Sequence, residues 1–185
     1  MRRQAVIELG LKGFLPIIGD RLGMTNLALY ERQRELVRAG LLEQSDGRGP
    51  GSGVKATPRS ISVLVISVLA TERLSEVKAR SSLAAGAETY AECALTNEKS
   101  FLNAVTHIFA NPGLARFVDY ISVSRTAGRA EIRFTDAAGI ERKSEFFGNS
   151  AIDPGVSITA TLSHALLHEI ISDMQKFKIL LSDNK

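Results

Sequence analysis

The chain has 185 residues, 44% hydrophobic and 23% charged, with a formal net charge of +3 at neutral pH. These fractions are ordinary for a globular protein and exclude a chain that is disordered throughout. The single cysteine, Cys93, excludes an internal disulfide framework and any metal site built from several cysteines. The longest apolar run, 61–70, is far shorter than the ~20 residues of a membrane-spanning helix. No apolar signal segment follows the basic residues at positions 2 and 3, so we expect a soluble, cytoplasmic protein.

The charge is unevenly distributed along the chain. Residues 1–85 contain 13 Lys and Arg against 8 Asp and Glu, whereas residues 86–185 contain 10 against 12. A basic half joined to a mildly acidic half is typical of a nucleic-acid-binding domain followed by a domain with another task.

Short helices are predicted over residues 4–40. A first apolar stripe breaks near Lys12, and a second helical segment over 14–22 carries Pro16 in its first turn. Thr25 is a good N-cap for a third helix that runs to about Ala39.

A glycine-rich loop follows at 45–53, between short strand-like segments at 40–44 and 54–56. Thr57 and Pro58 then begin an apolar stretch that predicts a buried helix over 58 to about 72, continued by the amphipathic stretch 72–82. Residues 80–92 are small and weakly patterned, which indicates a linker or hinge.

The second half predicts a helix, a β-meander and a helix. Thr96 is the expected cap of the first helix. The spacing of apolar residues then changes from a helical period of 3.6 to a strand period of 2. This predicts strands around 121–123, 129–134 and 140–147 and turns at 126–128 and 136–139. A short extended stretch at 156–159 precedes an amphipathic helix over about 162–177.

The stretch 19–29 has the spacing of a helix-turn-helix. Gly19 stands where two helices approach closely, Gly23 permits a left-handed turn, and Leu22 and Leu29 fill the core between the helices. Over roughly residues 3–72 the chain resembles the winged helix-turn-helix DNA-binding proteins of bacterial regulators. One departure is that Arg32 and Gln33 stand where many of these proteins carry a core aliphatic residue.

The resemblance implies that 25–39 is a recognition helix and 45–55 a wing. The helix residues that would face the major groove are Thr25, Asn26, Leu27, Tyr30 and Arg34. Asn reads adenine, Arg reads guanine, an apolar side chain meets the thymine methyl group, and a threonine hydroxyl bonds a phosphate. In the wing, Arg48 would enter the minor groove or hold a phosphate, with Lys55 and Arg59 beside it.

The expected fold class is therefore α+β. A winged helix-turn-helix domain at 1–79 is joined by a linker or helical connection at 80–94 to a small α+β domain at 95–185, which contains a helix, a three-stranded antiparallel meander and a helix. We expect a DNA-binding transcriptional regulator that acts as a homodimer on double-stranded DNA. The second domain would serve oligomerisation or sense an effector ligand or a protein partner. The alternative is a protein–protein adaptor whose winged domain docks a partner without touching DNA.

Other chemistries have weaker support in the sequence. The glycine-rich loop lacks the Gly-Lys-Ser/Thr ending of a phosphate-binding loop. His164 and His168 are spaced for a metal pair, but Ala165 stands where a zinc protease needs glutamate. Cys93 has no basic neighbour in sequence and is expected to be a small buried hydrophobe, and His107 a partly buried structural residue. We therefore predict no enzyme activity, no cofactor and no metal site.

Overall fold

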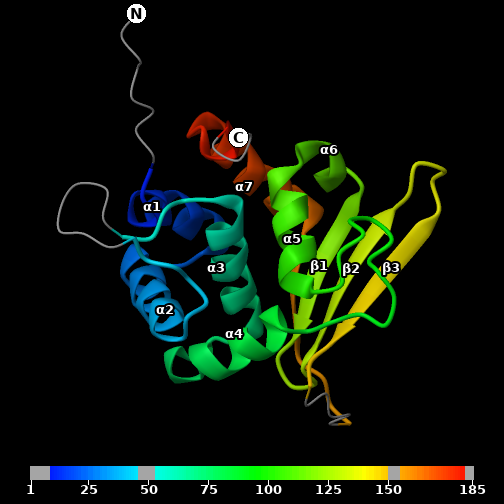
Figure 1. The fold of residues 1–185 in the computed structure, drawn as a ribbon, viewed down its shortest axis with the longest axis horizontal. Helices are drawn as coiled ribbons and strands as arrows, with labels where there is room; N and C mark the ends of the chain where they lie inside the picture. Colours follow the sequence, from blue (N-terminus) through cyan, green and yellow to red (C-terminus); the bar gives the residue numbers. More distant parts are fainter. Residues whose placement is uncertain (1–8, 46–52, 150–154, 182–185) are drawn as a thin grey trace, which may run out of the picture.

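The computed structural model describes residues 9–45, 53–149 and 155–181, and within them the chain forms seven α-helices and one four-stranded antiparallel sheet (Figure 1). This is an α+β fold, as the sequence predicts. The helices are α1 (Leu11–Leu22), α2 (Asn26–Arg38), α3 (Pro58–Ala70), α4 (Val77–Ala85), α5 (Phe101–Ala110), α6 (Pro112–Ala115) and α7 (His164–Lys176). The strands are β1 (Val118–Ser124), β2 (Arg129–Thr135), β3 (Glu141–Phe147) and β4 (Thr159–Ser163). Short 3₁₀ turns lie at η1 (Leu74–Glu76) and η2 (Ile179–Leu181).

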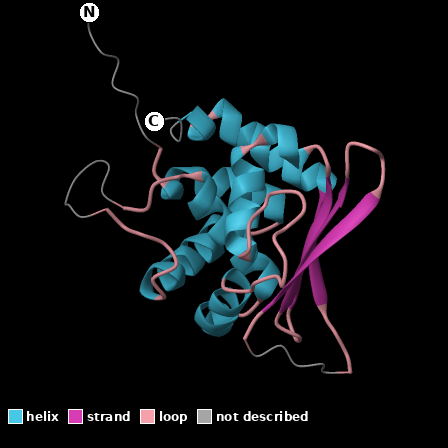
Figure 2. Ribbon diagram, turned by 45° about the vertical axis from the view of Figure 1, so that its right-hand side comes forward, coloured by secondary structure: helices cyan, strands magenta, loops and turns pink. Residues whose placement is uncertain are grey.

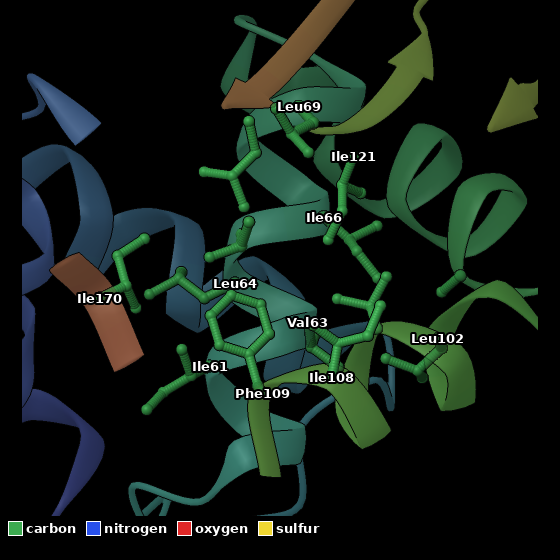
Figure 3. Close-up of a cluster of buried hydrophobic side chains, with 14 of the residues drawn as sticks. Ile61, Val63, Leu64, Ile66, Leu69, Leu102, Ile108, Phe109, Ile121 and Ile170 are labelled. Atoms are coloured by element: carbon green, nitrogen blue, oxygen red, sulfur yellow. The ribbon is translucent and has the colours of Figure 1, made fainter. Parts of the chain in front are cut away.

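Helix α3 lies at the centre of the fold, between α1 and α2 on one side and α5 and the sheet on the other (Figure 1). Its residues from Ser60 to Ser67 are all buried, so the prediction of a buried helix is confirmed. The close-up in Figure 3 shows Ile66 beside Ile121 of β1 and Leu64 near Ile170 of α7. Because α3 has no solvated face, it connects the helices before it with the sheet and helices after it in one hydrophobic cluster.

The predicted start of α3 is correct, but its predicted end is not. Thr57 Oγ1 accepts a hydrogen bond from Ser60 N at 3.1 Å, and Ser60 Oγ accepts one from Thr57 N at 2.8 Å, which completes a capping box. The helix ends at Ala70 rather than about residue 72, and Thr71 is extended. The stretch 72–82 does not continue it: the turn η1 and the separate helix α4 follow.

The segment 80–94 begins with the last residues of α4 and is then joined to the sheet. Glu88 N donates to Phe147 O at 3.1 Å, and Phe147 N donates to Glu88 O at 2.8 Å. Ala87 and Cys93 are fully buried. The segment thus packs against β3, and the division of the chain at 79 and 95 stays a prediction.

Two further local predictions are corrected. Residues 11–22 form one helix without a break at Lys12, and Pro16 lies inside it rather than in its first turn. Helix α5 is capped by Ser100, whose Oγ accepts from Asn103 N at 3.3 Å. Thr96 instead lies in a turn closed on Cys93 O, which accepts from Thr96 N at 3.2 Å and from Asn97 N at 2.7 Å.

The sheet has four strands in the order β3-β2-β1-β4, where the sequence predicted three. The predicted meander corresponds to β1, β2 and β3. The added strand β4 pairs antiparallel with β1, with Ala160 opposite Val123. Its five residues directly before α7 are too short a run for periodicity to separate them from the helix. Figure 2 shows the helices gathered on one side of this sheet.

An ion-pair cluster ties α1 to α7. Arg21 Nε donates to Asp173 Oδ2 at 2.8 Å and Arg21 Nη1 to Glu169 Oε2 at 3.0 Å. Lys176 Nζ donates to the other oxygen of Asp173 at 2.9 Å. Burial by itself raises the pKa of the Asp173 carboxyl, but the hydrogen bonds from Arg21 and Lys176 outweigh burial and hold that pKa below its usual range.

We expect Asp173→Asn to destabilise the protein at neutral pH and much less in acid. A lowered folded-state pKa stabilises the fold above the unfolded pKa of ~3.9, and this contribution is lost as pH falls through the folded value. Urea unfolding at neutral and at acid pH should therefore show a gap in free energy of unfolding between parent and variant that shrinks in acid. Glu169→Gln is the control, because the half-exposed Glu169 should contribute little. A gap that does not change with pH would contradict this role for Asp173.

No helix among the described residues is long and apolar enough to cross a membrane.

Candidate nucleic-acid interface

The turn between α1 and α2 fixes how the second helix is presented. A Cβ added to Gly19 would lie 2.8 Å from Met24 O and 3.3 Å from Leu29 Cδ1, so only glycine allows the two helices to approach this closely. Gly23 ends α1 in the left-handed region at φ 64°, and Met24 N donates to Gly19 O at 2.9 Å. Leu29 is fully buried against this turn. Gly19, Gly23 and Leu29 therefore pack as the sequence predicts, whereas Leu22 is only partly buried.

The N-terminal end of α2 is exposed. Thr25 caps the helix, as predicted, with its Oγ1 accepting from Ala28 N at 3.2 Å. Its hydroxyl hydrogen remains available to a further acceptor. Asn26 is exposed, and Leu27 is 70% exposed, the largest exposure of any leucine among the described residues whose side chains are given. Three of the predicted site residues thus lie together at one solvent-facing helix end.

The remaining two predicted residues of α2 lie one and two turns further along. Tyr30 is partly buried, and Lys12 Nζ of α1 sits 5.1 Å from the centre of its ring. Arg34 is exposed and paired with Glu31, whose carboxylate oxygens its Nη1 contacts at 3.0 Å. Arg38 makes the same kind of pair with Glu35.

A hollow of about 460 Å³ opens between α1, this part of α2 and the base of the glycine-rich loop. Lys12 and Arg38 line it together with Tyr30 and Arg34. Sequence reasoning missed Lys12 and Arg38 as site residues. Lys12 comes from the start of the preceding helix, and only the packing of α1 on α2 brings it to Tyr30.

The loop base is closed by short backbone ladders rather than by full strands. Ser45 N donates to Gly53 O at 3.1 Å, so the chain entering the loop pairs with the chain leaving it. The leaving chain also pairs with the segment before α1: Leu11 N donates to Val54 O at 2.7 Å and Ala56 N to Leu9 O at 2.9 Å. Arg48 lies outside the described residues.

Lys55 and Arg59 line a second hollow of about 270 Å³, which shares Gln44, Gly53 and Val54 with the first. Arg59 stands in the first turn of α3, and its Nη1 donates to Asn103 Oδ1 of α5 at 3.4 Å. The described residues of the predicted site therefore fall into an α2 group and a Lys55–Arg59 group, and the second group lines a hollow of its own.

Arg32 and Gln33, which stand where many winged helix-turn-helix proteins carry an aliphatic core residue, determine how α2 is rotated about its axis. Arg32 is only 2% exposed, and its Nη1 donates to Ser67 O, near the end of α3, at 2.7 Å. Burial, and secondly the charge of Arg125, lower the pKa of Arg32. Gln33 is also buried, and it lines the hollow beside α2. With Arg32 directed toward α3, residues 26, 27 and 34 face solvent.

His164, His168, Cys93 and His107 are the remaining residues that the sequence singles out. His164 Nδ1 lies 2.6 Å from Val118 O, and its ring centre lies 4.3 Å from that of His168. No group of three or more potential metal ligands occurs among the described residues. Cys93 is fully buried, as predicted. His107, half-buried, lies 3.9 Å from Glu98.

Comparison with known proteins gives no family assignment: no protein-family model, no curated protein and no solved structure matches the chain.

Proposed function

We propose that this chain binds duplex DNA through α2 and the base of the glycine-rich loop, as a winged helix-turn-helix transcriptional regulator. The main support for the proposal is the exposed start of α2, where Thr25, Asn26 and Leu27 face solvent. The rest of the helix is held against the protein by its buried residues. A major groove can accommodate an exposed helix end of this kind, and its side chains match the chemistry of base edges.

The positions of the basic residues around α2 indicate that different parts of the helix contact bases and phosphates. Lys12, Arg34 and Arg38 gather at the hollow beside the loop base, away from the Thr25–Leu27 end. Cations beside an exposed helix suit the phosphates that flank a groove. We therefore assign the base contacts to Asn26 and Leu27. Arg34 can reach either a base edge or a phosphate. Lys12 and Arg38 position the helix.

Two carboxylates hold the arginines of α2 in the free protein. Glu31 pairs with Arg34 and Glu35 with Arg38, each across one turn of the helix. On binding DNA, each arginine would exchange a carboxylate for a phosphate or a base edge. The carboxylates thus weaken binding to any duplex, so that only a sequence offering good base contacts is bound tightly.

We also propose that the protein acts as a homodimer, since one helix in one groove gives limited affinity and two half-sites supply more. The sheet and the helices around it would then serve assembly or effector sensing.

Fluorescence anisotropy with a random-sequence duplex across a salt series tests the proposal. The parent should bind at low salt, with an affinity that falls as a power of the salt concentration. Glu31→Gln should bind more tightly, because it releases Arg34 and removes a negative charge that faces the phosphates. The matched control is Glu141→Gln, an exposed carboxylate on β3, which should bind like the parent. Absence of binding at low salt would favour the adaptor interpretation instead, and binding with equal affinities for all three proteins would show that the Glu31–Arg34 pair does not face DNA.

A further inference from the structure

The two edges of the sheet differ in chemistry. The β3 edge carries four charged residues among seven: Glu141, Arg142, Lys143 and Glu145 lie within Glu141–Phe147. Its end is already paired, because Phe147 exchanges two backbone hydrogen bonds with Glu88. Charged and covered edges are how proteins prevent a sheet from adding a further strand.

Among the described residues, the β4 edge has neither charged side chains nor a paired segment to protect it. Residues 155–163 contain no Lys, Arg, Asp or Glu. Within the described part of the chain, β4 pairs with β1 alone. Both Thr159 and Thr161 are exposed. This edge is therefore short, uncharged and open.

The pairing pattern determines which backbone groups of β4 remain free. Arg125 N donates to Ile158 O at 2.7 Å, so residue 158 faces β1. Because successive residues of an antiparallel strand alternate in direction, Ala160 and Leu162 also face β1, and Thr159 and Thr161 direct their N–H and C=O groups outward. These outward groups form a template for one more antiparallel strand.

Exposed apolar side chains extend the same edge. Val156 is 73% exposed and Ile158 is 55% exposed, and both lie directly before β4. Ile158 is on the same side of the chain as Ala160 and the buried Leu162, since the three alternate along the strand. A strand added at β4 would therefore cover apolar surface as well as backbone groups.

We propose that the β4 edges of two copies of this chain pair antiparallel and join the two sheets into one of eight strands. A two-fold axis at Ala160 would place Thr159 beside the partner's Thr161 and Ile158 beside the partner's Leu162. A second copy fits this edge because the strand carries no charge, so self-pairing brings no like charges together. The assembly goes beyond DNA binding and does not depend on it.

Light scattering coupled to size-exclusion chromatography of the full chain, without DNA, tests the proposal. The parent should be a dimer. Thr161→Pro should be a monomer, because it removes an N–H that points away from β1 and leaves the β1–β4 ladder intact. Thr161→Lys should also be a monomer, because it places one lysine from each copy on the same face of the joined sheet, in diagonal positions on either side of the axis. Thr161→Lys does not constrain the backbone, so it still tests the pairing of the β4 edges if the proline variant fails to fold.

Lys143→Pro is the matched control. Position 143 faces the outer edge of β3, as Phe147 does, so proline there should leave the dimer intact. A monomeric parent, a dimer that survives both Thr161 substitutions, or dissociation by Lys143→Pro to the same extent would each overturn the proposal. Because DNA is absent, these results are separate from any failure of the DNA-binding assay.

Discussion

Val65→Asp should unfold the protein or lower its free energy of unfolding by several kcal/mol. Val65 is 1% exposed in the middle of α3, where every residue from Ser60 to Ser67 is buried. An ionised carboxylate there would have no partner, and a protonated one would still lose its hydrogen bonds to water. Urea unfolding followed by far-UV circular dichroism measures the effect. A variant that unfolds at the same urea concentration as the parent would contradict the central place of α3.

The control is Val65→Thr, which keeps the shape of the side chain and adds a hydroxyl. Helix α3 already contains two buried hydroxyls that bond to the helix itself. Ser62 Oγ donates to Pro58 O at 2.8 Å, and Ser67 Oγ donates to Leu64 O at 2.7 Å. A threonine at 65 can donate in the same way, whereas an ionised carboxylate cannot donate at all. We therefore expect the Thr variant to fold with a much smaller loss of stability.

The ends of α3 show how far the sequence predicts this fold. The start follows from Thr57 and Ser60, which bond to each other three residues apart, so a local pattern identifies it. The end depends on residues far away. Arg32 of α2 donates to Ser67 O, and Arg125 Nε, in the β1–β2 turn, donates to Leu69 O at 3.0 Å. Carbonyls satisfied by side chains from other elements leave no local signal.

The same distinction applies to the candidate interface. The cap at Thr25 and the close approach at Gly19 are local and follow from residue type and spacing. The burial of Arg32 does not follow from them, because arginine on a helix is ordinarily solvated. Lys12 joins the α2 group only through the packing of α1. Arg59 is adjacent to the loop in sequence, yet it turns toward Asn103 of α5.

Base-reading and phosphate-positioning residues should respond differently to substitution. Asn26 stands at the exposed start of α2, where an amide can address a base edge. Asn26→Ala should therefore cost about 1–3 kcal/mol on a preferred duplex and leave binding to a random duplex nearly unchanged. Arg34→Ala should also weaken binding mainly to the preferred duplex. Its effect should be smaller, because Glu31 competes with DNA for the Arg34 guanidinium.

Lys12→Ala should instead weaken binding to preferred and random duplexes alike, because a lysine at the hollow beside the loop base can meet a phosphate but not a base edge. Losing one phosphate contact lowers the slope of log affinity against log salt by about one. Arg48→Ala is expected to behave in the same way. Fluorescence anisotropy of each variant on both duplexes across a salt series measures the two effects together. If Asn26→Ala weakens both duplexes equally, or Lys12→Ala affects only the preferred one, the assignment of roles along α2 is wrong. If all four variants bind like the parent, α2 is not the surface that meets DNA.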